Sequence, residues 1–158
     1  MTCLETSRLI GPFVDDELDA RSVIDVETHL ARCGMARILV VDDDEHVRRV
    51  AVRMLTEAGH EVRDAASGAL GLRLWRNGGA DLVVTDICMP DMTGFELITE
   101  MRAVGPMVPV IAMSGSVVMR DLEVLRRTEL LGAVHPLAKP FSFDQLMAAV
   151  AAALVLRA

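Results

Sequence analysis

The sequence predicts an α/β fold in which a doubly wound, five-stranded parallel sheet carries helices on both faces and follows an N-terminal helical extension. One observation predicts the sheet, and a second predicts the extension. From residue 37 onward, short runs rich in β-branched residues alternate with amphipathic stretches of about ten to fifteen residues. Connections of that kind join parallel strands through right-handed crossovers and cover both faces of the sheet. Residues 1–35 contain one amphipathic helical pattern and no strand-like run.

Five segments have the composition of strands, and five have the periodicity of helices. The predicted strands are ILVV (38–41), EVRDA (61–65), DLVVTD (81–86), VPVIAMS (108–114) and AVHPLA (133–138). The predicted helices are 45–58, 66–76, 94–104, 119–131 and 142–156. We expect the flavodoxin-like strand order 2-1-3-4-5, which makes the first and third strands neighbours.

The N-terminal segment DDELDARSVIDVETHLARC (15–33) predicts a single helix. Its apolar residues recur mostly at three- and four-residue steps, and Gly34 is placed to end the helix; they are Leu18, Val23, Val26 and Leu30. One helix cannot bury a core alone, so it must pack on the following domain, join a partner or be held by a metal. We therefore divide the chain into an N-terminal segment, 1–35, and an α/β domain, 36–158.

Composition excludes several classes of function. The net charge is -7, the pI is near 5.0 and no Lys/Arg cluster is present, so we expect no direct contact with nucleic acid. The longest apolar runs, such as 147–156, are too short to span a bilayer, and the N-terminus is acidic instead of basic. The three cysteines do not form the pattern of a disulfide framework. These features predict a cytoplasmic protein that does not bind membranes.

Acidic residues follow two of the predicted strands. Asp42 and Asp43 come after the first strand, and Asp86 ends the third. If these strands are neighbours, the three carboxylates converge at the carboxyl edge of the sheet, where they repel one another unless a cation lies between them. Mg²⁺ suits such a site because it takes one or two carboxylates and keeps several waters. The alternative, solvated loop charge, is disfavoured by the combined pattern.

A hydroxyl and an ammonium reach the same edge. Ser114 ends the fourth strand and Lys139 follows the fifth. Their chemistry is complementary to a phosphoryl group, since Lys139 neutralises one oxygen and Ser114 donates a hydrogen bond to another. Asp86 is then the candidate nucleophile, and attack by its carboxylate forms an acyl phosphate.

Four motifs in order along the chain carry a resemblance to a known family. They are RILVVDDDE (37–45), VVTDICMPDMTGFELI (83–98), VIAMSG (110–115) and GAVHPLAKPF (132–141). In sequence and spacing they resemble the receiver domain of two-component response regulators, over about three quarters of the chain. The resemblance implies a domain that accepts a phosphoryl group in a phosphorelay and is not itself an enzyme.

The resemblance also implies a role for each matching residue of the acid cluster. Asp86 would be the phosphorylation site, and Asp42 and Asp43 the metal-binding acids, with Asp43 the direct ligand. Asp86 and the backbone carbonyl of Cys88 would complete the protein ligands of Mg²⁺. The Cys88 side chain lies where neighbours influence water access to the acyl phosphate, and we expect an ordinary neutral thiol there.

Around the fifth strand, the chain both matches the family and departs from it. Ser114 would be the switch hydroxyl, and Lys139 the phosphate-binding lysine, followed by Pro140 in what is often a cis bond. The family usually has an aromatic residue three positions before the lysine, but here that position is Pro136. His135 could substitute sterically, although a ring on a fixed proline backbone is a different device. We expect the phosphorylation chemistry to survive and signal transmission to be altered.

Other polar and sulfur-containing residues are interpreted structurally. Asp44 is expected to cap the helix that begins at Glu45, and Asp91 and Thr93 to shape the turn before the third helix. Met54, Met101 and Met113 are expected to fill the core, Trp75 to pack on an amphipathic helix, and His46 and His60 to lie at the surface.

The N-terminal segment resembles a degenerate zinc finger of the anti-sigma-factor type. That pattern continues as H-x3-C-x2-C, but its last cysteine is absent because position 36 is alanine. Cys3, His29 and Cys33 could supply three zinc ligands, whereas a closed structural site uses four. The alternatives are a surface helix with incidental thiols, a helix that docks on a partner, or a start of the true receiver at Met35.

Three functional hypotheses remain, beside a fourth that is discounted. The leading hypothesis is a stand-alone receiver that takes its phosphoryl group from a histidine kinase or a phosphotransfer protein. It would signal to a downstream protein, or form a homodimer, through the fourth helix, fifth strand and fifth helix, where Leu122, Leu125 and Phe143 are candidates for exposed apolar area. The alternatives are an anti-sigma-like binding module regulated by its receiver, and an unphosphorylated pseudo-receiver scaffold. An aspartyl-phosphate hydrolase is discounted, since it would carry its acids as D-x-D at one strand end.

Overall fold

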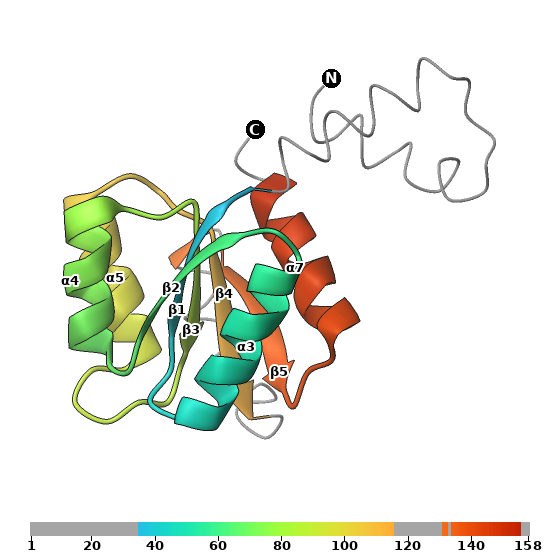
Figure 1. Cartoon of the computed structure of the whole chain (residues 1–158). Coiled ribbons are helices and arrows are strands. Elements are labelled where there is room, and N and C mark those ends of the chain that lie inside the picture. Colours follow the sequence, from blue (N-terminus) through green and yellow to red (C-terminus); the bar gives the residue numbers. More distant parts are fainter. Residues whose placement is uncertain (1–34, 116–130, 133, 156–158) are drawn as a thin grey trace, which may run out of the picture.

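The computed structural model describes residues 35–115, 131–132 and 134–155. This part of the chain forms a central sheet with helices on either side (Figure 1). Its strands are β1 (Arg37–Val41), β2 (Glu61–Ala65), β3 (Leu82–Asp86), β4 (Val110–Gly115) and β5 (Val134–Lys139). Its helices are α3 (Glu45–Glu57), α4 (Gly68–Gly78), α5 (Gly94–Val104) and α7 (Phe143–Val155). None of the described helices combines the length and the apolar character needed to cross a membrane.

The strands pair in parallel in the order β2-β1-β3-β4-β5, which confirms the predicted fold class and topology. β1 and β3 are direct neighbours, with Val41 opposite Thr85, so the residues after both strands emerge side by side. The carboxyl edge of the sheet therefore gathers the ends of β1, β3 and β4. β2 and β5 are the two edge strands, and β5 contains Pro136, which has no backbone N–H to donate.

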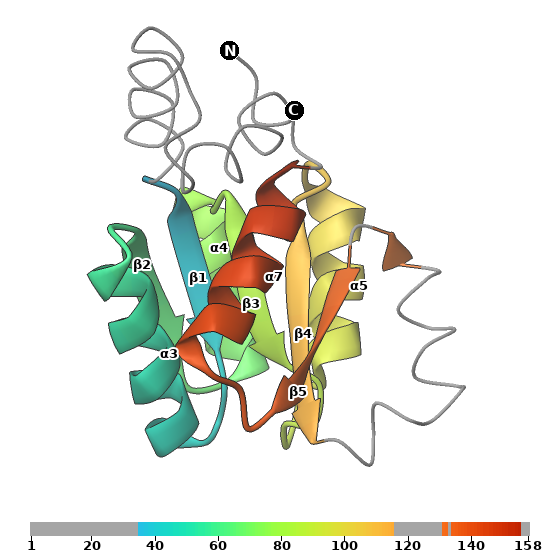
Figure 2. The ribbon, with the colours of Figure 1, turned by 90° about the vertical axis from the view of Figure 1, so that its right-hand side faces the viewer.

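Alternate residues of the central strands face two separate cores. One core lies beneath α3 and α7, where Ile38 and Val40 of β1 meet Leu55 and Leu146. The other lies beneath α4 and α5 and includes Trp75. Figures 1 and 2 show the two helix pairs on opposite faces of the sheet. Because both faces are covered, β3 is buried along its whole length, as a parallel central strand requires.

Helix ends follow the capping residues. The Asp44 side chain accepts from the backbone N–H groups of His46 and Val47, which confirms it as the cap of α3. Thr93 and Glu96 form a reciprocal capping box at the start of α5. Helix α4 starts two residues later than predicted, because the Ser67 hydroxyl accepts from the N–H of Leu70 and so caps it.

The remaining differences from prediction are small, and two segments lie outside the described residues. β5 runs one residue further than predicted, so that Lys139 ends the strand instead of following it. Met101 and Met113 are fully buried and Met54 is partly buried, as expected of core residues. The N-terminal segment 1–34 and the predicted helix 119–131, apart from its last residue, are not described.

Candidate functional site

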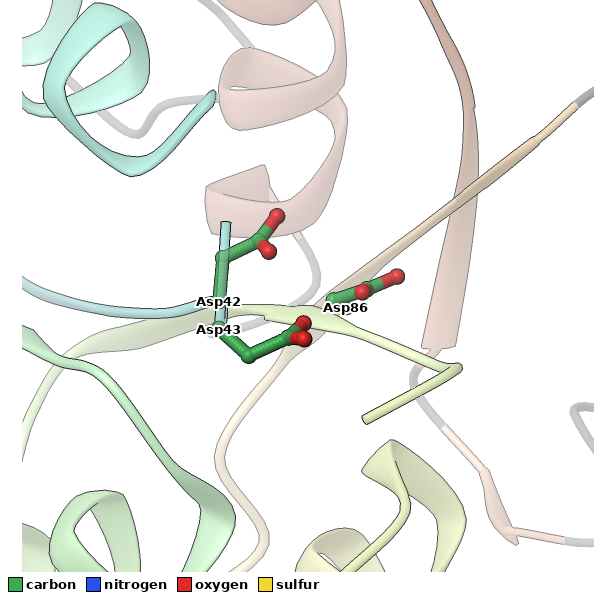
Figure 3. A group of neighbouring side chains, drawn as sticks. All are labelled: Asp42, Asp43 and Asp86. Atoms are coloured by element: carbon green, nitrogen blue, oxygen red, sulfur yellow. The ribbon is translucent and has the colours of Figure 1, made fainter. Parts of the chain in front are cut away.

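The three predicted acids come together at the carboxyl edge of the sheet. Asp42 directly follows β1 and Asp86 is the last residue of β3, so the pairing of those two strands places them side by side. Oxygens of Asp42, Asp43 and Asp86 all lie within 4.8 Å of one another. Figure 3 shows the three carboxylates projecting in the same direction from this edge. Asp42 and Asp86 are buried and Asp43 is exposed, so the cluster opens to solvent on one side.

Lys139 supplies a positive charge to this cluster from the edge strand β5. It ends β5, and β4 lies between β5 and β3, so its side chain reaches past the end of β4. Its Nζ lies 2.8 Å from Asp42 Oδ2 and 3.4 Å from Asp86 Oδ1. The lysine thus contacts both buried acids, and the sequence-predicted convergence of these residues is present in the structure.

The electrostatics of the cluster are those of crowded negative charge. Burial raises the pKa of Asp86, the nearby charge of Asp42 raises it further, and Lys139 offsets only part of this effect. For Lys139 itself, burial lowers the pKa, but pairing with Asp42 and then Asp86 outweighs burial, and the net pKa is raised. The lysine therefore stays charged, while the Asp86 carboxylate is held in an environment that resists its ionisation.

The loop after β1 is held by contacts that position Asp42. The backbone N–H of Asp44 donates to Asp42 Oδ1 at 2.9 Å, and the Arg48 guanidinium donates to the Asp42 carbonyl at 2.8 Å. Arg48 also pairs with Asp64 on β2 at 2.8 Å. Arg48 was not among the residues that the sequence predicted for the site. Its place in the first turns of an amphipathic helix after the acids was the only available signal.

The segment after β3 is packed tightly against Asp86. The N–H of Cys88 donates to Asp86 Oδ1 at 3.4 Å, and the Thr85 hydroxyl donates to the Asp86 carbonyl at 3.0 Å. Gly94 donates its N–H to Ile87 and lies so close that a Cβ there would collide with the Asp86 carbonyl oxygen. The close approach to the Asp86 carbonyl is the reason that a glycine stands at this position.

Ser114 and the residues of β5 complete the rim of the site. Ser114 is buried on β4, directly after Met113, which is the register partner of Asp86. Its hydroxyl donates to the Gly115 carbonyl at 3.1 Å, so it makes a local bond instead of pointing its proton at Asp86. Pro136 lies opposite Ala112, and the neighbouring His135 has a buried Nε2 with no partner among the described residues. Burial lowers the pKa of His135, which favours a neutral ring.

The other candidate residues have mixed outcomes. His46 is exposed, but His60 is only half-exposed, and its Nδ1 accepts the N–H of Ala36 at 3.3 Å. Phe143 is 42% exposed, which agrees with the exposed apolar area expected of it. The candidate zinc ligands Cys3, His29 and Cys33, and the surface residues Leu122 and Leu125, lie outside the described residues.

A doubly wound sheet of order 2-1-3-4-5 with an acid cluster and a lysine at its carboxyl edge defines a CheY-like receiver module. A family model described as "Response regulator receiver domain" matches residues 38–151. The chain therefore belongs to the response-regulator receiver family of two-component systems, as the sequence motifs predicted. Aspartate phosphorylation and Mg²⁺ binding in an acidic pocket are general features of that family.

Curated relatives and solved structures agree with this assignment. The DNA-binding transcriptional regulator NtrC of a Bradyrhizobium strain is 38% identical over 117 residues, covering 74% of this chain and 24% of that protein. The sensor kinase CckA of Brucella abortus is 35% identical over 138 residues, covering 86% of this chain and 14% of that protein. The chain thus spans about a quarter of the NtrC relatives that it matches. The chemotaxis protein CheY4 of Vibrio cholerae superposes with a TM-score of 0.69 at 30% identity, over 76% of this chain and 99% of CheY4.

A second family model, described as "Putative zinc-finger", matches residues 3–34. This agrees with the resemblance noted for the N-terminal segment. The match covers a small share of the chain, and the residues concerned lie outside the described structure.

The donor set of the acid cluster fits a hard divalent cation. Three carboxylates within 4.8 Å face one ammonium, so the cluster has an excess of negative charge. Burial is the main cause of the raised pKa of Asp86, and the Asp42 charge adds to it, so a bound cation would favour the ionised form. Oxygen ligands, an open side at Asp43 and excess negative charge are the properties that Mg²⁺ prefers.

Proposed function

We propose that this chain receives a phosphoryl group on Asp86 from a histidine kinase or a histidine phosphotransfer protein and transmits the signal by protein contact. The observation that carries the proposal is the arrangement of Asp86 beside Asp42 and Asp43, with Lys139 in contact with both buried acids. Membership in the receiver family supports it. We further propose that residues 36–158 are the receiver, that 1–35 are a separate segment, and that the chain acts in the cytoplasm as a signalling module and not as an enzyme.

The proposed step is a displacement at phosphorus. An Asp86 carboxylate oxygen forms a bond to phosphorus while the bond from phosphorus to the donor atom breaks, and the donor leaves with that electron pair. For a phosphohistidine donor the leaving atom is an imidazole nitrogen. The acyl phosphate carries more negative charge than the carboxylate it replaces, so its oxygens need neutralisation by the cationic groups around the site.

Each neighbouring residue has a part in this step. Asp42, Asp43, Asp86 and the backbone carbonyl of Cys88 would hold Mg²⁺, which when bound neutralises negative charge on the phosphoryl oxygens. Lys139 would exchange its contact with Asp86 for a phosphoryl oxygen. Ser114 would turn its hydroxyl from the Gly115 carbonyl toward another phosphoryl oxygen.

Signal output is proposed to depend on backbone movement after Ser114. Pro136 stands where the family usually carries an aromatic residue, so the ring movement that accompanies the hydroxyl is missing. A shift of the loop after β4, biased by the Ser114 contact, would then carry the change to β5 and α7. The downstream partner or a second copy would dock on this face, where Phe143 is exposed.

The proposal is tested by incubating the full chain with acetyl phosphate and MgCl₂ and measuring intact mass. We expect an adduct of one phosphoryl group that is absent without Mg²⁺ and absent in Asp86→Asn. Asp144→Asn, an exposed acid on α7, is the matched control and should keep the adduct. An adduct that persists in Asp86→Asn would contradict the site, and absence of an adduct from every donor would favour a pseudo-receiver scaffold.

A second candidate function rests on the match of residues 3–34 to the putative zinc-finger model. The N-terminal segment would bind a partner such as a sigma factor, with Cys3, His29 and Cys33 as zinc ligands and the receiver as regulator. Metal analysis of the purified chain tests the zinc, and a pull-down with sigma factors tests the partner. One zinc per chain, lost in Cys33→Ser, would support it, and zinc-free protein without a captured sigma factor would contradict it.

A further inference from the structure

The end of the sheet opposite the acid cluster contains a cavity that the phosphorylation site does not use. In Figure 1 this is the upper end of the sheet, where β1 begins and where α4 and α5 terminate. The cavity has a volume of about 530 Å³, and its apolar lining includes Trp75, Val104, Pro106, Met107 and Pro109. It lies between the last turn of α4 and the loop that joins α5 to β4.

Apolar side chains are exposed around this cavity to an unusual degree. Four large hydrophobic residues are exposed in the described part of the chain, and three of them lie at this end: Met35 at 74%, Val104 at 55% and Met107 at 64%. Val104 and Met107 line the cavity, and Met35 is two residues from Arg37, which also lines it. A cluster of this kind on a small domain marks a contact surface more often than scattered single residues do.

Trp75 adds a polar group to this surface. It is only 6% exposed, and its Nε1 finds no acceptor among the described residues. The far edge of its ring lies against Gly105, where a Cβ would collide with it. A buried indole N–H without an acceptor costs free energy, so a bound segment that offers a carbonyl or carboxylate near Trp75 would be favoured.

The chain itself provides an occupant that matches this surface. Thirty-four residues precede Met35, and they enter the receiver through Met35 and Ala36, immediately beside the cavity. Their predicted helix carries Val23, Val26 and Leu30 on one side, within a few residues of the entry point. A segment tethered this closely has a high effective concentration at the cavity, so that weak apolar contacts suffice to hold it.

Charge complementarity favours the same occupant. Residues 1–34 contain seven acidic and three basic residues. The rim of the cavity carries Arg37 and Arg76, whose side chains are 52% and 49% exposed. The Arg76 pair with Glu100 is long, at 3.6 Å, and exposed on both sides, so it competes weakly with a further acidic partner. Arg37 pairs with Asp81 at 3.5 Å and donates to the Gly78 carbonyl, but half of its side chain stays exposed.

We propose that the N-terminal segment docks on its own receiver at this cavity, with the apolar side of its 18–30 helix against Val104 and Met107. Over these residues a helix is about 20 Å long, which is comparable to the width of this end of a small domain. Docking here keeps the segment at the far end of the sheet from Asp86. The segment and a phosphoryl donor can therefore occupy the chain at the same time.

Limited trypsin cleavage of the full chain at Arg21, followed by intact mass, tests the docking. Met107→Asp removes an apolar contact that is 64% exposed, and Phe143→Asp, at an apolar residue that is 42% exposed on α7, away from the cavity, is the control. We expect Met107→Asp to be cleaved at Arg21 at least about threefold faster than wild type, because cleavage follows the undocked population, and Phe143→Asp to match wild type. An unchanged far-UV circular dichroism spectrum and an unchanged urea midpoint check that the receiver remains folded.

The reciprocal experiment changes the segment and observes the cavity. Leu30→Asp should increase amide hydrogen exchange in residues 104–109, whereas Thr28→Asp, on the opposite side of the predicted helix, should leave it unchanged. Equal cleavage of Met107→Asp and wild type, or equal exchange in Leu30→Asp and wild type, would overturn the proposal. Protection that disappears on dilution would also overturn it, because the occupant would then be a second copy of the chain.

Discussion

Replacing Lys139 with methionine removes the cation that contacts both buried acids of the site, while a side chain of similar length remains. In the wild type, Lys139 Nζ lies 2.8 Å from Asp42 and 3.4 Å from Asp86. The variant leaves the carboxylates of Asp42 and Asp86 buried with no direct counter-charge. We therefore expect Lys139→Met to be less stable than wild type near neutral pH in the absence of divalent cations.

The magnitude follows from these distances and from solvent access. At an effective dielectric constant near 20, the two contacts are worth about 6 and about 5 kcal/mol before desolvation is counted. Removing one partner of a buried pair has a measured net cost of about 3–5 kcal/mol. The Lys139 side chain is 20% exposed, and Asp86 can take up a proton instead of remaining charged, so we expect a smaller loss, about 2–3 kcal/mol.

The pH dependence has a definite sign. Burial and the Asp42 charge raise the pKa of Asp86 in the folded state, so protonated Asp86 favours folding, and this stabilisation is lost as pH rises through the folded pKa. Lys139 opposes that rise in pKa. The loss of stability in Lys139→Met is therefore largest above the folded pKa of Asp86, where Asp86 is ionised, and it becomes smaller as the pH falls below that pKa. Added Mg²⁺ should recover part of the loss, because the cation takes over the charge neutralisation.

Urea unfolding followed by Trp75 fluorescence measures these effects, in EDTA or MgCl₂, at neutral and mildly acidic pH. Arg49→Met is the matched control, since Arg49 is 78% exposed and pairs only at the surface with Glu45, and it should cost less than about 0.5 kcal/mol. A Lys139→Met variant as stable as wild type at neutral pH in EDTA would refute the argument. A deficit that does not change between neutral and acidic buffer would refute the role of carboxylate repulsion.

Three further predictions concern the loops around the site. Gly94→Ala should destabilise the domain by about 2 kcal/mol or more, because its Cβ collides with the Asp86 carbonyl oxygen. It should also lower the yield of the acetyl phosphate adduct. Urea unfolding measures the first effect and intact mass the second, and a variant as stable as wild type would contradict the close approach. Thr93→Ala should cost about 1 kcal/mol by removing the cap of α5, whereas Thr93→Ser should keep most of it. Asp43→Asn should weaken Mg²⁺ binding in calorimetry by at least about tenfold with little loss of stability, since Asp43 is exposed; unchanged affinity would exclude Asp43 as a ligand.

The sequence was sufficient for the parts of the site that depend on strand order. Once the first and third strands are neighbours, the acids that follow them must meet, and the structure places Asp42, Asp43 and Asp86 together. Capping is equally local, so Asp44 was predicted as a cap from the residues that follow it, whereas Thr93 was expected only to shape the turn that it caps. These features were predictable because each depends on short-range rules or on one topological choice.

Features that depend on tertiary contacts were not predicted. Arg48 donates to the Asp42 carbonyl and pairs with Asp64 on a different strand, and no local pattern marks an arginine for that role. His60 was expected at the surface, yet it accepts the N–H of Ala36, because the start of β1 lies beside the loop before β2. The hydrogen bond from the Ser114 hydroxyl to the Gly115 carbonyl was not predicted either, since the motif indicates a hydroxyl at this position but not its orientation.

The two edge strands determine how copies of this domain can meet. An exposed strand edge is a template for strand addition and for aggregation, and proteins block it with charge or proline. β2 carries Glu61, Arg63 and Asp64, and β5 carries Pro136, which removes a donor from the row that a further strand would need. We therefore expect Pro136 also to hinder growth of the sheet at the β5 edge, which directs association between domains to the helical surfaces.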